Sequence, residues 1–265
     1  MSLLVPLAPD RDAALARRNP VAKLAAAFIV TAGLLVTLDP VTPAVLLAFE
    51  LAVLPLTGIR VRVLVRRTVP LLIGVAGVAV ANLIVVQGGR TLVQLGPIDI
   101  TTHAVEAALS VSLRLLAIAL PGILVLATTE PMDLADALVQ QVRVSPRFAY
   151  GALAALRLLP LLSADWHQIG RARRARGLDA GRSPVTAVRL FSSQVFAVLV
   201  AAVRRGVRLA SAMEARGFDT STPRSVARQQ RMRGADWLLV TAAILAVFVA
   251  TAVSITLGSW HIAFG

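Results

Sequence analysis

Hydrophobic residues in this chain form long runs with almost no charge, rather than the short amphipathic patterns of a soluble domain. A helix of roughly 20 apolar residues is long enough to cross the hydrocarbon core of a bilayer. Runs of about this length predict membrane-spanning helices at residues 21–38, 41–59, 69–86, 104–128 and 237–257. The pattern therefore predicts an all-α polytopic membrane protein with about five transmembrane helices.

Residues 130–235 have a different pattern, in which alanine and leucine are mixed with many arginines. We predict two long helices here, from Ser145-Pro146 to Ala175-Arg176-Gly177 and from Ser183-Pro184 to Ala215-Arg216-Gly217. Serine is a favoured N-cap, proline fits the first helical position, and glycine adopts the left-handed conformation that stops a helix. At about 1.5 Å per residue, each helix would be about 45–50 Å long.

The basic residues indicate which segments lie in the cytoplasm. Of the 27 Lys and Arg residues, 25 lie in three segments, at residues 11–23, 60–67 and 143–233. Because basic segments stay on the cytoplasmic side, the N-terminus is expected inside and the connections around Asp39 and Gly96 outside. Arg157 and Arg189 interrupt the apolar parts of the two long helices, and arginine-rich segments flank both. We therefore expect these helices at the inner face of the membrane rather than across it.

Composition agrees with a multi-pass protein of the cell membrane, in contact with the lipid bilayer. The chain is 57% hydrophobic and only 15% charged, whereas soluble domains carry about a quarter charged residues. We predict three parts: an N-terminal membrane domain at 1–129 with about four transmembrane helices, a cytoplasmic domain at 130–235, and a C-terminal transmembrane helix at 236–265.

The cysteine, lysine and histidine content of the chain excludes several kinds of chemistry. The chain has no cysteine, which removes disulfides, thiolate zinc sites and iron–sulfur clusters. Its only lysine, Lys23, follows Ala22, so the phosphate-binding GxxxxGK[ST] loop of an ATPase does not occur. The histidines, His103, His167 and His261, are too scattered to share one helix face. From these counts no cofactor and no metal site are expected, and the chain is not expected to be an ATPase itself.

The ends of the two long helices repeat at a spacing of 40 residues, as Ala175-Arg176-Gly177-Leu178-Asp179 and Ala215-Arg216-Gly217-Phe218-Asp219. An arginine there could simply complement the helix dipole. Two copies on helices of matched ends favour a different interpretation, in which each arginine extends past the glycine and offers its rigid fork of donors to a partner carboxylate. Two similar docking motifs in one chain favour a partner that is made of two similar subunits.

With these motifs, the sequence resembles the T component, or transmembrane coupling subunit, of energy-coupling factor (ECF) transporters, the EcfT/CbiQ-like family. The resemblance covers nearly the whole chain. Besides the two Ala-Arg-Gly motifs, it rests on Ala212-Met213-Glu214-Ala215-Arg216-Gly217-Phe218, on Thr128-Thr129-Glu130-Pro131 and on Arg157-Leu158-Leu159-Pro160. The first of these runs is the most specific.

The resemblance implies that Arg176 and Arg216 end two coupling helices and insert into grooves of two ATP-binding cassette ATPase subunits. Those partners would hydrolyse ATP, while a small membrane S component would bind the transported vitamin or metal ion. Around the docking triplets Ala175-Arg176-Gly177 and Ala215-Arg216-Gly217, supporting roles are expected for Arg157, Pro160, Arg173, Asp179, Glu214 and Asp219. Pro160 is also expected to kink the first helix.

Two alternatives stay open at this point. Asp133 and Asp136 share one helix face and could hold magnesium in a membrane enzyme acting on a phosphorylated lipid. Glu50 and Arg114 are charges within predicted spans and could be the coupling pair of an ion-driven secondary transporter. A nucleic-acid partner is not expected, because a chain with a single tyrosine offers few surfaces on which bases stack.

Overall fold

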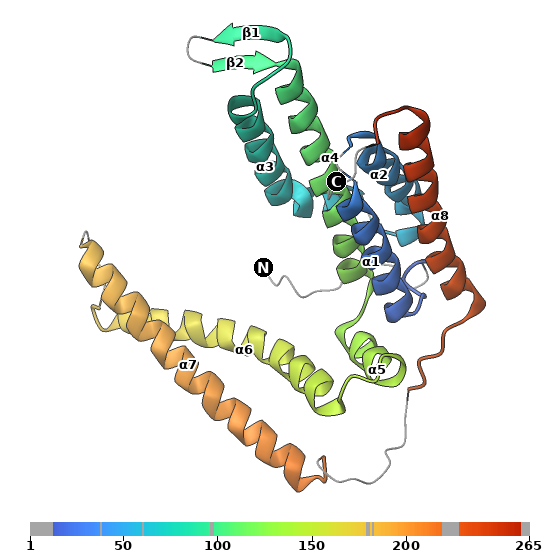
Figure 1. Cartoon of the computed structure of the whole chain (residues 1–265). Coiled ribbons are helices and arrows are strands. Elements are labelled where there is room, and N and C mark those ends of the chain that lie inside the picture. Colours follow the sequence, from blue (N-terminus) through green and yellow to red (C-terminus); the bar gives the residue numbers. More distant parts are fainter. Residues whose placement is uncertain are drawn as a thin grey trace. The chain divides into compact units, whose positions relative to one another are not determined.

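The computed structural model describes residues 13–37, 39–59, 61–95, 98–178, 181, 183–218 and 228–260. Over these residues the chain is helical apart from one short hairpin, which confirms the predicted all-α class (Figure 1). The elements in chain order are α1 (Pro20–Val36), α2 (Val41–Val53), the 3-10 helix η1 (Leu54–Thr57), α3 (Val61–Val85), β1 (Thr91–Leu95), β2 (Ile98–Thr101), α4 (Thr102–Thr128), α5 (Pro131–Gln141), α6 (Pro146–Ala175), α7 (Pro184–Ala215) and α8 (Gly234–Thr256).

The described elements fall into two compact units. One unit holds α1 to α4, the hairpin, the first part of α5, and α8, and we call it the membrane bundle. The other contains α6 and α7, which we call the helix pair.

The core of the membrane bundle lies between α1, α2, α4 and α8, and α3 packs on α4. Its large side chains come from α1 and α2, where Leu34 and Leu46 are fully buried. Alanines face them from the other two helices, with Ala117 on α4 and Ala250 on α8 also fully buried. Small residues at these positions let helix backbones approach closely, which is how helices associate in lipid.

Polar residues join the start of α1 to the start of α8 and to the end of α4. The Asp236 carboxylate, at the start of α8, accepts hydrogen bonds from the backbone N–H groups of Asn19 (2.9 Å) and Arg233 (2.7 Å). The Lys23 ammonium donates to the carbonyl of Thr128 at 2.9 Å, at the end of α4. These groups satisfy backbone donors and acceptors that helix ends leave open.

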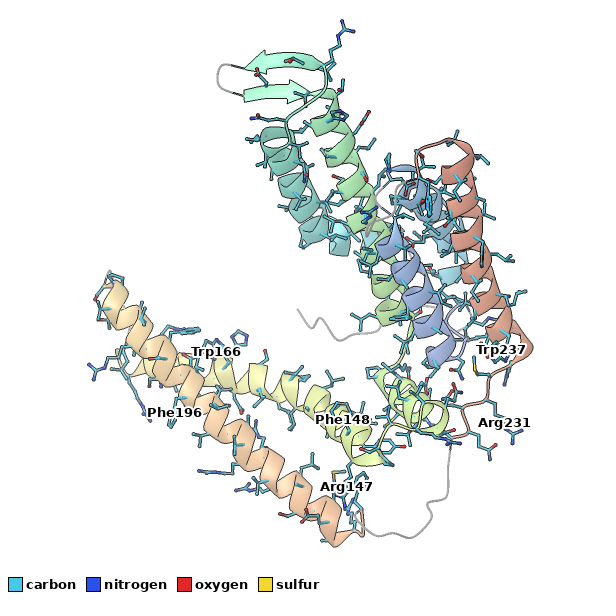
Figure 2. The ribbon with its side chains drawn as sticks, viewed as in Figure 1. Arg147, Phe148, Trp166, Phe196, Arg231 and Trp237 are labelled. Carbon is cyan, nitrogen blue, oxygen red and sulfur yellow. The ribbon has the colours of Figure 1, made fainter. Side chains whose placement is uncertain are left out.

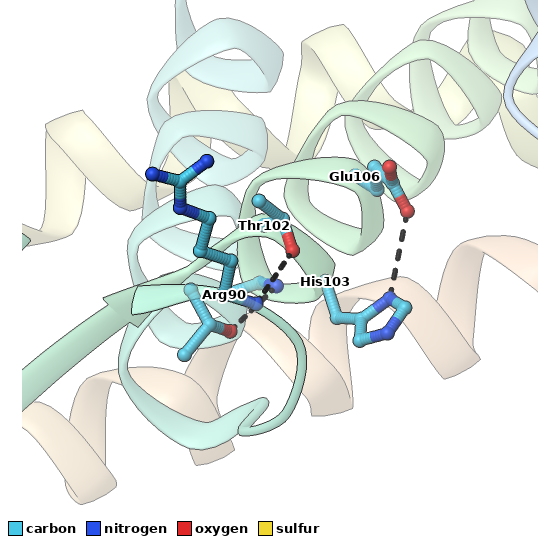
Figure 3. A network of polar contacts seen from close by, with 6 residues as sticks. Arg90, Thr102, His103 and Glu106 are labelled. Carbon is cyan, nitrogen blue, oxygen red and sulfur yellow. Dashed lines mark hydrogen bonds and ion pairs between the residues drawn. The ribbon is translucent and has the colours of Figure 1, made fainter. Parts of the chain in front are cut away.

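The connection predicted as a loop near Gly96 contains an antiparallel hairpin of β1 and β2. The hairpin is joined to α4 by mutual bonds between Arg90 and Thr102, from the Thr102 N–H to the Arg90 carbonyl (3.0 Å) and from the Arg90 N–H to the Thr102 hydroxyl (3.3 Å) (Figure 3). Nearby, His103 Nδ1 lies 3.6 Å from Glu106 Oε2. The pattern missed here was the alternation of apolar and polar residues in β2, Ile98-Asp99-Ile100-Thr101, and the β-branched residues Thr91 and Val93 in β1.

Five helical segments are long and apolar enough to cross a membrane, judged by length and composition among the described residues: Thr68–Val85 and the helices α4, α6, α7 and α8. The number of candidate spans agrees with the prediction, but two of the five, α6 and α7, are not among the predicted spans. The predicted spans at 21–38 and 41–59 are helical yet shorter, with 17 residues in α1 and 13 in α2. Because length and composition do not locate a helix in space, the cytoplasmic placement of α6 and α7 stays a prediction.

Candidate functional site

Both helices of the pair begin as their sequences predict. The Ser145 hydroxyl accepts a hydrogen bond from the Phe148 N–H at 3.4 Å, and Pro146 is the first residue of α6. In α7 the Ser183 hydroxyl accepts from the Thr186 N–H at 3.3 Å. These caps satisfy one open backbone donor of each first turn.

The C-terminal ends of α6 and α7 have the same backbone geometry. Gly177 and Gly217 are left-handed, with φ of 73° and 74°. In α6 the Leu178 N–H donates to the Arg173 carbonyl at 3.0 Å, and in α7 the Phe218 N–H donates to the Met213 carbonyl at the same distance. Both ends are therefore Schellman caps, in which a side chain at the glycine position would be strained.

The arginines of the two motifs are the C-cap residues, one position beyond Ala175 and Ala215, the last helical residues of α6 and α7. Arg176 has φ −91° and ψ 9°, and Arg216 has φ −86° and ψ 10°. Both are exposed, and neither guanidinium bonds or pairs with another residue that the structure describes. The exposed alanines before them add no bulk beside these cations. Each end is therefore a projecting cation on a rigid cap, suited to a carboxylate or a carbonyl cluster on another molecule.

The helix pair is antiparallel and held by polar bonds along its contact. Arg173 donates to the Leu190 carbonyl and to the Ser193 hydroxyl, both at 2.8 Å. The Gln194 amide donates to the Trp166 carbonyl at 2.8 Å. These bonds join the second half of α6 to the first half of α7.

A charged pair continues this contact. Both terminal nitrogens of Arg205 donate to the two oxygens of Asp165, at 2.5 and 3.1 Å. A bidentate arginine–carboxylate pair sets direction as well as distance. The sequence did not predict Asp165, Gln194 and Arg205 as contact residues, because each lies among other polar or charged residues and in no distinctive motif.

The antiparallel arrangement separates the two arginine ends. Near the end of α7, Phe218 packs edge-on against Tyr150 of α6, with ring centroids 6.2 Å apart. Arg216 therefore lies beside the start of α6, whereas Arg176 lies at the opposite end of the pair (Figure 1). A partner that contacts both ends must present two sites separated by most of a helix length.

The remaining predicted site residues are distributed over the same helices. Arg157 and Glu214 are exposed, and α6 continues as a helix through Pro160. Arg173, predicted as a supporting residue, holds α6 to α7. Asp179 and Asp219 lie outside the described residues.

The helix pair also exposes a large apolar surface. None of the α7 residues is buried within the described chain. Phe148 on α6 is 73% exposed and Phe196 on α7 is 67% exposed (Figure 2). Exposed apolar area of this extent marks a surface that contacts lipid or another protein.

The residues of the two alternative functions do not form the expected sites. Arg114 donates to the Thr37 carbonyl, and Glu50 has no hydrogen-bond partner among the described residues, so the two charges are not bonded to each other. Asp133 lies in the first turn of α5, where acids suit the helix dipole, and Asp136 is buried. No group of three or more potential metal ligands occurs in the part of the chain that was described.

A family model and three relatives with similar sequences all point to one kind of membrane transport protein. The family model described as cobalt transport protein (CbiQ) matches residues 12–227. The chain is 31% identical over 211 residues to the energy-coupling factor transporter transmembrane protein EcfT of Thermosediminibacter oceani, covering 77% of this chain and 76% of that protein. It is 31% identical over 186 residues to EcfT 1 of Listeria monocytogenes, covering 67% and 70%. It is 29% identical over 243 residues to EcfT of Limosilactobacillus fermentum, covering 88% and 91%.

Proposed function

The chain belongs to the cobalt transport protein (CbiQ) family, and from this membership we propose that it is the transmembrane energy-coupling subunit of an ECF-type ABC importer. The subunit is not itself an enzyme. Two ATP-binding cassette partners bind and hydrolyse ATP, and a small membrane S component binds the imported vitamin or metal ion. The N-terminus faces the cytoplasm, as the distribution of basic residues favours.

Docking of the ATPases uses the two arginine ends of the helix pair. The observation that carries this assignment is the pair of identical Schellman caps, each with an exposed and uncommitted arginine. Ala175 and Ala215 leave space beside the cations, and Gly177 and Gly217 hold the caps. A fixed cap loses little conformational freedom when it binds, which favours affinity.

Coupling then requires that movement at the arginine ends reaches the membrane. ATP binding brings the two ATPases together and changes the separation of their docking grooves. The bonds made by Arg173 and Arg205 keep α6 and α7 in register while the ends move. The exposed apolar faces of the pair transmit the movement to the S component.

Co-purification from native membranes tests this function. We expect the tagged wild-type chain to retain two nucleotide-binding subunits and a small membrane protein, identified by mass spectrometry. Arg176→Ala and Arg216→Ala should each weaken the ATPase association, and the double variant should nearly abolish it. Truncating one partner of a buried charge-assisted pair costs about 2–5 kcal/mol of binding free energy.

The matched control is the double variant Arg171→Ala/Arg208→Ala, which removes two exposed arginines from the same helices. It should co-purify and transport like the wild type. Full ATPase retention by Arg176→Ala/Arg216→Ala at equal expression contradicts the docking assignment. A wild-type chain that purifies alone in mild detergent contradicts the coupling role, and an ion-gradient uptake assay would then be the next measurement.

A further inference from the structure

A cavity of about 270 Å³ lies inside the membrane bundle and belongs to neither arginine end. Side chains from the segment before α1 and from α1, α2, η1, α4 and α8 line it, and nearly all of them are aliphatic or aromatic. Its volume approaches the lower limit of small-ligand pockets, which is about 300 Å³. An apolar cavity of this kind takes a hydrocarbon group rather than a polar solute.

One end of the cavity carries a positive charge. Arg18 lines this end together with Leu15 and Leu56, whose backbones are joined by a hydrogen bond from the Leu15 N–H to the Leu56 carbonyl at 3.1 Å. The Arg18 guanidinium makes no hydrogen bond or ion pair with any described residue. Lys23 also lines the cavity, but its ammonium donates to the carbonyls of Ala16 and Thr128. Arg18 is therefore the cation that is available to a ligand.

The other end of the cavity excludes an anion. Glu50 lines the wall there from α2, about one turn before that helix ends at Val53, whereas Leu56 lies beyond that end, in η1. Its side chain is only 6% exposed, and neither carboxyl oxygen has a hydrogen-bond partner among the described residues. An anionic group at this depth would meet an uncompensated carboxyl, whereas a hydrocarbon chain would not. A ligand therefore places its headgroup at Arg18 and its chain toward Glu50.

We propose that this cavity binds one acyl chain of an anionic phospholipid, whose headgroup phosphate pairs with Arg18. In a zwitterionic lipid such as phosphatidylcholine, the choline cation of the headgroup repels the same arginine and weakens this contact. Arginine binds phosphate through two parallel hydrogen bonds, which fixes the headgroup at the mouth of the cavity. The bound lipid fills the space between α1, α2, α4 and α8 and becomes part of the packing of the bundle. The proposal is independent of the ATPase docking described above.

Photolabelling of the full-length chain in phosphatidylcholine nanodiscs tests the site. The probes are a phosphatidylglycerol and a phosphatidylcholine, each with a diazirine near the end of the same acyl chain. We expect phosphatidylglycerol to label the deep wall, around Val30 and Ala243, about fivefold more than phosphatidylcholine does, as one arginine beside an anionic headgroup predicts. Equal labelling of this wall by both probes overturns the proposal.

Two kinds of variant locate the headgroup and the chain. Arg18→Gln should remove the roughly fivefold preference for phosphatidylglycerol, whereas Arg17→Gln, which changes the neighbouring exposed arginine outside the cavity lining, should keep it. Ala242→Phe fills the cavity and should abolish labelling of the deep wall, whereas Leu245→Phe on the exposed face of α8 should not. A preference that survives in Arg18→Gln contradicts the proposed phosphate contact, even if the filled variant does not fold.

Discussion

Gly33 sets how closely α1 approaches α8. A Cβ atom built on this residue would lie 2.6 Å from Cγ1 of Val247, well inside the contact distance of two carbon atoms. Any other residue, even alanine, would therefore force Val247 to move. The membrane bundle therefore depends on one glycine at a position where helix propensity alone would favour alanine.

Gly33→Val should destabilise the membrane bundle. Overpacking a core position costs about 1–3 kcal/mol, and each kcal/mol lowers the Tm by roughly 2–4 °C in a domain of this size. Thermal unfolding in detergent, followed by size-exclusion chromatography, measures the shift. A second change, Val247→Ala, makes room for the new side chain and should recover part of the loss.

The control for this prediction is Gly122→Val on α4, where an added Cβ would meet nothing within 4 Å. This variant also replaces glycine by valine within a helix, so its effect on helix propensity is the same, but its Cβ atom meets no neighbouring side chain. If both variants lower the Tm by the same amount, the close approach at Gly33 is not what stabilises the bundle.

The two long helices are bonded to each other as well as capped at their own ends. Arg173 is the residue of the contact that lies nearest to the Arg176 end, and it makes two bonds to α7. Its neighbour Arg174 belongs to the same last turn and is exposed. Loss of Arg173 should therefore loosen the junction between the helices without changing the charge at Arg176.

Arg173→Ala should broaden the distribution of distances between α6 and α7, and Arg174→Ala should leave it unchanged. Because the chain has no cysteine, nitroxide labels can be placed at two introduced cysteines without a background. Labels on exposed positions of α6 and α7, Arg171→Cys and Val188→Cys, report the distance distribution by pulsed electron paramagnetic resonance. An unchanged distribution in Arg173→Ala would show that the bonds to Leu190 and Ser193 do not hold the pair.

On the scale of the whole bundle, Asp39 joins the α1–α2 connection to the end of α8. Its Oδ2 accepts from the Thr42 N–H (2.7 Å), the Thr42 hydroxyl (2.8 Å) and the Ser254 hydroxyl (2.7 Å). Burial alone would raise the pKa of the Asp39 carboxyl, but hydrogen bonds from Ser254 and Thr42 outweigh burial and hold the pKa below its ordinary value of 3.8. The contact links residues 215 positions apart in the chain.

This contact predicts an acid-sensitive stability. A carboxyl whose pKa is lower in the folded state than in the unfolded state stabilises the fold above its unfolded pKa, and this stabilisation is lost as the pH falls through the folded value. The Tm of the wild type should therefore fall as the pH drops below about 4. Asp39→Asn should have a lower Tm at neutral pH and a weaker dependence on acid.

Asp99→Asn serves as the matched control, since Asp99 is an exposed carboxyl of the β2 strand. It should unfold like the wild type at every pH. An acid transition that persists unchanged in Asp39→Asn would assign the sensitivity to another carboxyl.

Local sequence determined the helices and both arginine ends of the helix pair. Caps and stops act within about five residues, so Ser145, Ser183, Gly177 and Gly217 predicted where α6 and α7 begin and end. Long apolar runs likewise predicted the helices of the bundle, because burying apolar surface needs no particular partner. The missed hairpin had a local signal too, but its strands are only 5 and 4 residues long.

Only the tertiary structure decided which residues meet across those helices. Asp165 pairs with Arg205 because α6 and α7 pack antiparallel in one register, and Ser254 reaches Asp39 because α8 returns to α2. Gly33 faces Val247 for the same reason. Such contacts depend on the direction and spacing of packed helices, which many side chains set together, so no short stretch of the sequence contains them.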